Sequence, residues 1–177
     1  SERAIFDSHP VITTFHSFCV RVLREYHELL GLRRHFVIYD QNDATRAIKK
    51  ALEEAGYSPK QFEPRRILGI ISRAKGDALS RNQFLESASS YPERVAGEIW
   101  EHYETTMKKE HALDFDDLLL KTLRLIESNP VVASALRSRY HYIHIDEYQD
   151  TNKVQFELAR MLAGENKNIC VVGDIDQ

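Results

Sequence analysis

The stretch YHYIHIDEYQDTN, residues 140–152, joins a short apolar run to a cluster of acidic and amide side chains. The aromatic and β-branched residues at 142–145 predict a buried strand. Four polar side chains then follow within five positions: Asp146, Glu147, Gln149 and Asp150. Neighbouring carboxylates destabilise one another unless a positive group lies among them. The stretch therefore predicts a strand whose end faces a cation.

A second apolar run, NICVVGD at residues 168–174, also ends in an aspartate, and a predicted helix over 153–163 separates the two runs. This strand–helix–strand order predicts parallel strands that are buried on both faces of an α/β fold. Ligands of such sheets bind beyond the carboxyl ends of the strands, where Asp146 and Asp174 fall. The short stretch Val11–Thr13 is predicted to be a further strand.

The middle of the chain is predicted to be nearly all helix. Apolar residues recur at helical spacing from Phe15 to Leu30, and Gly31 is expected to end that helix. Four further helices are predicted to begin near a capping residue or an early proline, at Asp40, Pro64, Ser80 and Pro92. Trp100 and Tyr103, on the last of these helices, are predicted core residues.

Composition and charge limit the classes of protein. The chain has 177 residues, of which 42% are hydrophobic and 29% charged, and its net charge of −3 argues against a uniformly basic nucleic-acid coat. Residues 31–75 hold ten Lys or Arg against five Asp or Glu, whereas residues 140–177 hold seven acids against three bases. This asymmetry favours a basic arm beside an acidic, cation-seeking site, although ordinary variation between solvated faces gives the same pattern.

The sequence shows no pattern typical of a membrane span, a signal peptide or a cysteine metal site. No apolar run approaches the ~20 residues needed to cross a bilayer, and no signal-peptide pattern opens the sequence. Cys19 and Cys170 lack metal-ligand spacing and are interpreted as reduced core thiols. These features predict a cytoplasmic protein without a membrane partner.

The acidic strand end suits a magnesium–nucleotide complex. Hydrated Mg²⁺ prefers oxygen ligands, and in P-loop NTPases an aspartate after a strand holds the magnesium that bridges the nucleotide phosphates. Asp146 is therefore a candidate magnesium ligand, Glu147 a candidate base for the attacking water, and Gln177 a candidate sensor of the γ-phosphate. Acidic residues after strands are also common helix caps, so Asp150 is alternatively the cap of the next helix.

Four motifs, taken together, resemble successive motifs of the UvrD/Rep/PcrA-type superfamily I DNA helicases. They are TTFHSFCVRVLR (13–24), LDFDDLL (113–119), IHIDEYQDTN (143–152) and VVGDIDQ (171–177), in the family's order, and FEPRRILGIISRAKG (62–76) is similar to the PcrA branch. The resemblance implies a partial RecA-like (P-loop NTPase) domain, 1A, at residues 1–38 and 112–177. It also implies a large helical accessory insertion, 1B, at residues 39–111.

The resemblance also implies a function and its parts. It implies a helicase that translocates 3′ to 5′ on single-stranded DNA and unwinds duplex, coupled to Mg²⁺-dependent ATP hydrolysis. Asp146 would bind Mg²⁺, Glu147 would be the catalytic base, Gln149 would couple the site to its surroundings, and Gln177 would contact the γ-phosphate. The implied partners are ATP, single-strand/duplex junctions and DNA repair or replication proteins in the bacterial cytosol or nucleoid.

Two motifs are expected to touch single-stranded DNA. The resemblance implies contacts by Thr14 and His16, at a helix start where backbone N–H groups suit a phosphate, although a threonine there also caps the helix. Phe115 lies between carboxylates and is expected to stack on a base; core packing is the alternative. Four basic residues are weaker candidates for duplex phosphates, and a solvated helix face explains them equally well: Arg65, Arg66, Arg73 and Lys75.

A phosphate-binding loop needs closely spaced glycines followed by Lys and Ser or Thr, and none of the seven glycines has that context. In the family that loop lies upstream of the TFHS motif. We therefore expect a helicase fragment that hydrolyses no ATP alone. Two alternatives are the motor part of a helicase–nuclease subunit and a non-catalytic DNA-binding module.

Overall fold

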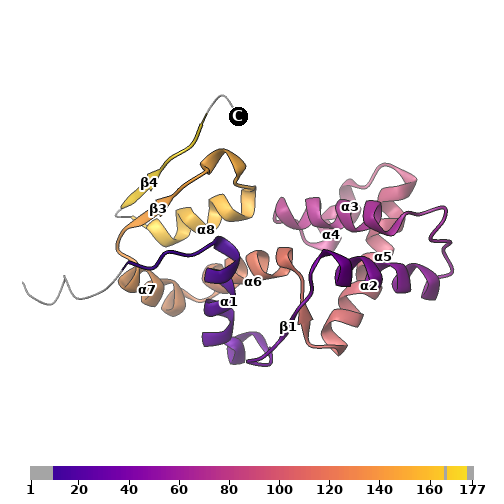
Figure 1. The fold of residues 1–177 in the computed structure, drawn as a ribbon, viewed down its shortest axis with the longest axis horizontal. Coiled ribbons are helices and arrows are strands. Elements are labelled where there is room, and N and C mark those ends of the chain that lie inside the picture. Colours follow the sequence, from indigo (N-terminus) through magenta and orange to yellow (C-terminus); the bar gives the residue numbers. More distant parts are fainter. Residues whose placement is uncertain (1–9, 166, 175–177) are drawn as a thin grey trace, which may run out of the picture.

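Two groups of helices and two pairs of short strands make up the computed structural model of this protein, which describes residues 10–165 and 167–174 (Figure 1). The helices are α1 (Phe15–Glu25), α2 (Gln41–Glu54), α3 (Pro64–Gly76), α4 (Arg81–Ser87), α5 (Tyr91–Lys109), α6 (Phe115–Ser128), α7 (Pro130–Arg139) and α8 (Lys153–Ala163). Two 3-10 helices, η1 (His27–Leu30) and η2 (Tyr148–Asp150), and the strands β1 (Val37–Ile38), β2 (Ala112–Leu113), β3 (Ile143–Ile145) and β4 (Ile169–Val171) complete the described elements. Helices with parallel strands are consistent with the predicted α/β class.

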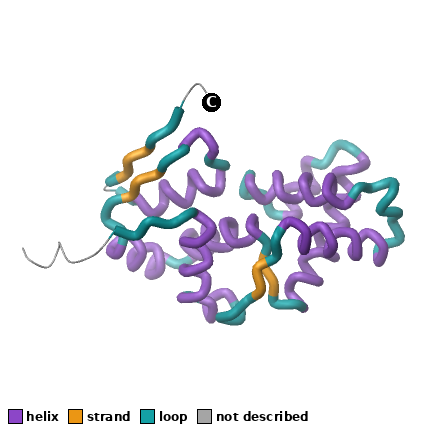
Figure 2. The backbone as a smooth tube through the Cα atoms, viewed as in Figure 1, coloured by secondary structure: helices purple, strands orange, loops and turns teal. Residues whose placement is uncertain are grey.

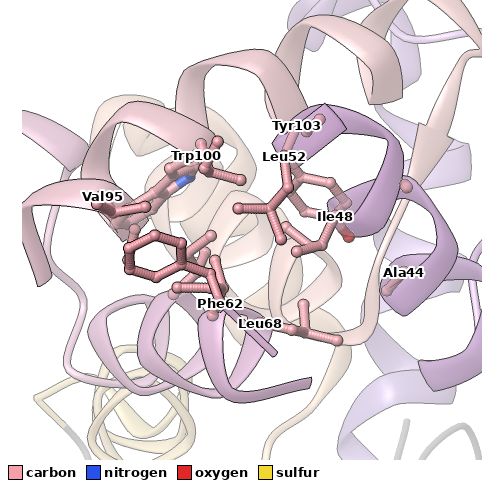
Figure 3. Packing of buried hydrophobic residues seen from close by; sticks show 14 of the residues in the cluster. Ala44, Ile48, Leu52, Phe62, Leu68, Val95, Trp100 and Tyr103 are labelled. Atoms are coloured by element: carbon pink, nitrogen blue, oxygen red, sulfur yellow. The ribbon is translucent and has the colours of Figure 1, made fainter. Parts of the chain in front are cut away.

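Each group of helices has its own hydrophobic core. One core belongs to helices α2 to α5, here called the α2–α5 lobe, and contains Trp100 and Tyr103 as predicted. Figure 3 shows Trp100, Phe62 and Leu52 among the residues of this core. The other core belongs to α1, α6, α7 and α8, here called the α6–α8 lobe. The chain thus buries its apolar surface in two separate places.

The strands β1 and β2 join the two lobes. They pair in parallel, with Val37 opposite Ala112 and Ile38 opposite Leu113, and they lie between the two groups of helices in Figure 2. The side chain of Ala112 belongs to the core of the α2–α5 lobe, whereas that of Leu113 belongs to the core of the α6–α8 lobe. The chain therefore enters and leaves the α2–α5 lobe through one short strand pair.

The strands β3 and β4 form the second pair, and they run parallel as predicted, with Ile143 opposite Ile169 and Ile145 opposite Val171. The predicted strand at Val11–Thr13 is wrong. Within the described residues β3 pairs only with β4, and residues 11–13 make no ladder with either strand. Extended backbone becomes a strand only where another strand supplies partners for its N–H and C=O groups.

The expectation that both faces of these strands are buried is also wrong. Helix α8 packs against β3, where Ile145 is buried, but Val171 on β4 and Val172 beyond it are exposed. Cys170 on β4 is exposed too, so it is not the core thiol that the sequence predicted, whereas Cys19 is buried. One helix covers one strand, and β4 forms an open edge (Figure 1).

Several predicted helix boundaries are confirmed. Asp40 and Ser80 cap α2 and α4 through complete capping boxes, and Pro64 opens α3. The predicted first helix is shorter than expected, because α1 ends at Glu25 and η1 follows before Gly31, whose φ of 62° closes that turn. No helix in the described part of the chain is both long and apolar enough to span a membrane.

Candidate nucleotide and DNA sites

The acidic loop DEYQD begins directly after β3 and is tied to the end of β4. The backbone N–H of Val172 donates to the carbonyl of Ile145 at 2.8 Å, and the N–H of Tyr148 donates to the carbonyl of Val172 at 2.9 Å. These two bonds fix the first residues of the loop, Asp146 and Glu147, beside the carboxyl ends of both strands. Both side chains are exposed.

Glu147 occupies a strained backbone conformation. Its φ of 52° and ψ of 44° lie in the left-handed region, which is uncommon for a residue other than glycine. The carboxylate of Asp146 accepts a hydrogen bond from the Glu147 N–H at 3.0 Å and so supports this turn. Strain of this kind costs on the order of 1–3 kcal/mol and clusters at functional sites.

Gln149 bridges the loop to the residues after β4. Its amide nitrogen donates to the Glu147 carboxylate at 2.5 Å, and its amide oxygen accepts from the N–H of Asp174 at 3.0 Å. Gly173 makes this approach possible, since a Cβ atom there would lie 2.7 Å from the Gln149 oxygen. The sequence placed Gln149 in the site but gave no partner for it.

The donor set of this loop fits a nucleotide-bound magnesium. No cluster of three or more His, Cys, Asp or Glu side chains with metal-binding geometry occurs among residues 10–165 and 167–174. Mg²⁺ usually keeps several waters and takes one or two protein carboxylates together with substrate phosphates. Asp146 and Glu147 can supply that number. Gln177 lies outside the described residues.

Asn152, rather than Asp150, caps the helix that follows the loop. The Asn152 side chain accepts from the N–H of Gln155 at 2.9 Å, and the Gln155 side chain completes a capping box. Asp150 instead ends η2 and is exposed. The acidic residues of the loop are therefore not occupied in capping α8.

Thr14 and His16 lie at the start of α1. Thr14 caps this helix, since its hydroxyl accepts from the N–H of Ser17 at 3.2 Å, so the structural alternative weighed for Thr14 holds. His16 is half-buried, and its burial lowers the pKa of the imidazole, which keeps the ring neutral near pH 7. Its ring meets the Phe115 ring edge to face, with 5.4 Å between the centroids.

Phe115 is the first residue of α6, and its side chain is 47% exposed. Core aromatics such as Tyr103 are fully buried, so packing in the core does not account for Phe115. The structure brings Phe115 from α6 and His16 from α1 together into one aromatic pair, in which Phe115 is exposed and His16 half-buried. Motifs about a hundred residues apart in the sequence thus meet at one surface.

Lys75 is buried, which the sequence analysis did not predict. Its side chain is 1% exposed, and its ammonium donates to the carboxylates of Asp114 at 2.8 Å and Asp117 at 2.9 Å. The hydroxyl of Tyr103 donates to Asp114 at 2.9 Å. The expectation that Lys75 lies on a solvated face, free to meet phosphates, is wrong. Lys75 follows the buried Ile71 by four residues and therefore shares its inward helix face.

The charges of this buried network stabilise one another. Burial lowers the pKa of the Lys75 ammonium, but the carboxylates of Asp117 and Asp114 outweigh burial and raise that pKa above its ordinary value. Burial raises the pKa of Asp114, but Lys75 outweighs it and holds that pKa below the usual range. Lys75 and Asp114 are therefore both charged at neutral pH. The other three basic candidates, Arg65, Arg66 and Arg73, are exposed on α3.

Comparison with known proteins identifies close relatives. Residues 4–177 match the UvrD/REP helicase N-terminal domain family. The chain is 42% identical over 166 residues to the ATP-dependent DNA helicase PcrA of Bacillus subtilis (strain 168), covering 94% of this chain and 22% of the relative. It is 39% identical over 178 residues to the ATP-dependent DNA helicase PcrA of Staphylococcus aureus (strain NCTC 8325 / PS 47), covering 99% of this chain and 24% of the relative. The chain thus spans about a quarter of the length of these relatives.

Proposed function

This chain belongs to the UvrD/REP helicase N-terminal domain family, and from that membership we propose that it is part of an ATP-dependent DNA helicase motor. The observation that carries the proposal is the acidic loop after β3, which Gln149 ties to the end of the neighbouring parallel strand. Relatives that cover nearly the whole chain are named as ATP-dependent DNA helicases.

The two separate hydrophobic cores support a division of the chain into two domains. Residues 1–38 and 112–177 would belong to a RecA-like ATPase domain, 1A, and residues 39–111 would form a helical accessory insertion, 1B. The α2–α5 lobe has its own core, and the chain enters and leaves it at the pair β1–β2. A lobe attached in this way can be carried by the ATPase domain without interrupting its core.

In the nucleotide site, the carboxylate of Asp146 would hold the magnesium of Mg–ATP. When bound, this ion neutralises charge on the β- and γ-phosphates during phosphoryl transfer. Glu147 would accept a proton from the water that attacks the γ-phosphorus, while ADP leaves. The amide of Gln149 orients the Glu147 carboxylate and links it to the backbone at Asp174. Gln177 would contact the γ-phosphate.

On the DNA side, Phe115 would stack on an unpaired base, with Thr14 and His16 contacting the same strand. Aromatic faces stack on any base, which suits a motor that moves along arbitrary sequences. The exposed arginines of α3 would contact duplex phosphates at a single-strand/duplex junction: Arg65, Arg66 and Arg73. Translocation would run 3′ to 5′.

The test is unwinding by the complete helicase that contains this chain. We expect ATP- and Mg²⁺-dependent strand separation of a duplex with a 3′ single-stranded tail and little separation with a 5′ tail. The 177-residue chain alone should release no phosphate from ATP, since none of its glycines forms a phosphate-binding loop. Failure of the complete protein to unwind either substrate would refute the proposal and leave the non-catalytic DNA-binding module. A nuclease domain in the same protein would favour the helicase–nuclease alternative.

A further inference from the structure

We propose that Lys75 is a positioning residue for DNA, because its buried ammonium holds the first turn of α6 in the orientation that exposes Phe115 beside His16. The inference rests on the proposed function, in which Phe115 meets a base. It assigns to a residue of the α2–α5 lobe a part in strand binding, without any contact between that residue and DNA.

The first turn of α6 is attached to the α2–α5 lobe through every acidic residue around Phe115. Asp114 and Asp117 accept hydrogen bonds from Lys75, and Asp116 accepts one from the Ser72 hydroxyl at 2.5 Å. Asp114 also caps α6 by accepting from the N–H of Asp117 at 2.7 Å. Phe115 is the residue of this turn whose side chain remains exposed.

Helix α3 supplies two of the side-chain donors, Ser72 and Lys75, from one face, and Tyr103 on α5 supplies a third. Ser72 and Lys75 are three residues apart, so their side chains point the same way and meet α6 together. His16 on α1 places its ring edge to face against Phe115. Phe115 thus follows and precedes aspartates that are bonded to α3, and its ring contacts the ring of His16.

A network of buried charges is not the simplest way to hold two helices together. Removing charges from water costs free energy. Well-packed apolar residues of similar volume often stabilise a fold as much as a buried ion pair does, or more. Directed hydrogen bonds supply something that apolar packing lacks, namely one defined geometry at the contact. Four bonds from three donors, Lys75, Ser72 and Tyr103, define how α6 begins, and the start of α6 defines where Phe115 lies.

The test compares Lys75→Met, Phe115→Ala and their double variant in the complete helicase. Binding of fluorescein-labelled oligo-dT is measured by anisotropy over a range of KCl concentrations and corrected for the folded fraction by circular dichroism. Phe115→Ala should weaken binding roughly 5- to 150-fold. Lys75→Met should weaken it by roughly 2- to 30-fold. The double variant should bind about as weakly as Phe115→Ala alone, since both changes remove the same stacking contact.

Two further variants sharpen the test. Lys49→Met makes the same chemical change at an exposed lysine of α2 and should leave binding unaltered. Ser72→Ala removes only the hydrogen bond to Asp116 and should weaken binding by about twofold. If Lys75→Met fails to fold, Ser72→Ala combined with Phe115→Ala provides the same comparison.

Three results would overturn the inference. Additive losses in the double variant would mean that Lys75 acts independently of Phe115. A fall of about 0.7 in the salt slope for Lys75→Met would mean that its ammonium contacts a phosphate. Unaltered affinity per folded molecule would leave Lys75 with a structural role alone. By contrast, wild-type protein that binds no single strand, or Phe115→Ala that binds normally, would refute the proposed function itself.

Discussion

Two acidic motifs in this protein follow short parallel strands and yet have opposite surroundings. LDFDD follows β2, and its carboxylates at Asp114 and Asp117 are buried against Lys75. DEYQD follows β3, and its carboxylates at Asp146 and Glu147 are exposed, without an ion pair to any lysine or arginine in the described part of the chain. One motif has received its positive partner from the protein, and the other presents its charge to solvent.

The difference comes from the residue that bridges each acidic motif. Helix α3 brings Lys75 to the end of β2, whereas Gln149, a neutral amide, bridges from the loop to Asp174 after β4. The LDFDD carboxylates therefore receive their positive charge from a residue that is distant in the chain, whereas Glu147 is bridged by a neutral residue two positions away. A carboxylate cluster that the fold already neutralises is structural, and one that it leaves open can receive a cation from outside.

The largest expected effect is on ATP hydrolysis, at the exposed DEYQD motif. Glu147→Gln in the complete helicase should keep nucleotide binding and lower the rate of ATP hydrolysis by about 10²- to 10⁴-fold, because the amide fills the same space but cannot accept a proton. Steady-state phosphate release and equilibrium binding of a fluorescent ATP analogue measure the two properties. Hydrolysis at the wild-type rate would remove Glu147 from the role of base.

The next largest effect is on folding stability, at the LDFDD motif that pairs with Lys75. Lys75→Met leaves two buried carboxylates without their cationic partner and should lower the free energy of unfolding by about 3–5 kcal/mol. Lys49→Met on α2 is the matched control and should change it by no more than about 0.5 kcal/mol. Urea titrations followed by circular dichroism compare the two variants. Equal stabilities would mean that the network contributes little to folding.

A smaller effect is expected at Phe115. Phe115→Ala should weaken single-strand binding by about 1–3 kcal/mol with an unaltered salt slope, because the change removes a ring and no charge. Phe115→Trp should largely retain binding, since a larger ring can still stack. If Phe115 were a core residue, the alanine variant would instead lose about 3–5 kcal/mol of folding stability. Thermal melts and salt-titrated binding on one preparation distinguish the two results.

The smallest expected effect is a loss of folding stability at acid pH. The pKa of Asp114 is held below its usual range in the folded protein, so the carboxylate stabilises the fold at pH values above its unfolded pKa of about 3.9. That contribution is lost as pH falls from about 4 through the lower, folded pKa. Wild-type stability should therefore fall over this window more than that of Asp114→Asn, which has no proton to bind there. Equal slopes in urea titrations between pH 5 and pH 2 would contradict the pairing.

Local chemistry allowed much of the fold to be predicted. The Ser80–Gln83 capping box and the early Pro64 mark helix starts within a few residues, and the structure confirms both. The order of two apolar runs around one helix was sufficient to predict parallel pairing of β3 and β4. These features depend on neighbours in the chain, which a sequence displays directly.

Long-range packing explains what was missed. Lys75 and Asp114 are 39 residues apart, and no local pattern shows that α3 and α6 meet. The inward position of Lys75, four residues after the apolar Ile71, was the available signal. Val11–Thr13 has β-branched composition, but a strand also needs a partner, which the described residues do not provide. The assigned roles of Asp146, Glu147 and Phe115 remain predictions.

The most direct measurement of the central claim is the Mg²⁺ dependence of ATP hydrolysis in the complete helicase. Wild type, Asp146→Asn and Asp114→Asn are titrated with MgCl₂ at fixed ATP and saturating oligo-dT. If the DEYQD loop receives the external cation, Asp146→Asn should raise the Mg²⁺ concentration for half-maximal hydrolysis at least about tenfold, since Mg²⁺ has few protein ligands to lose. Asp114→Asn should leave that concentration unchanged. A shift for Asp114→Asn, or no shift for Asp146→Asn, would contradict the assignment of the two motifs.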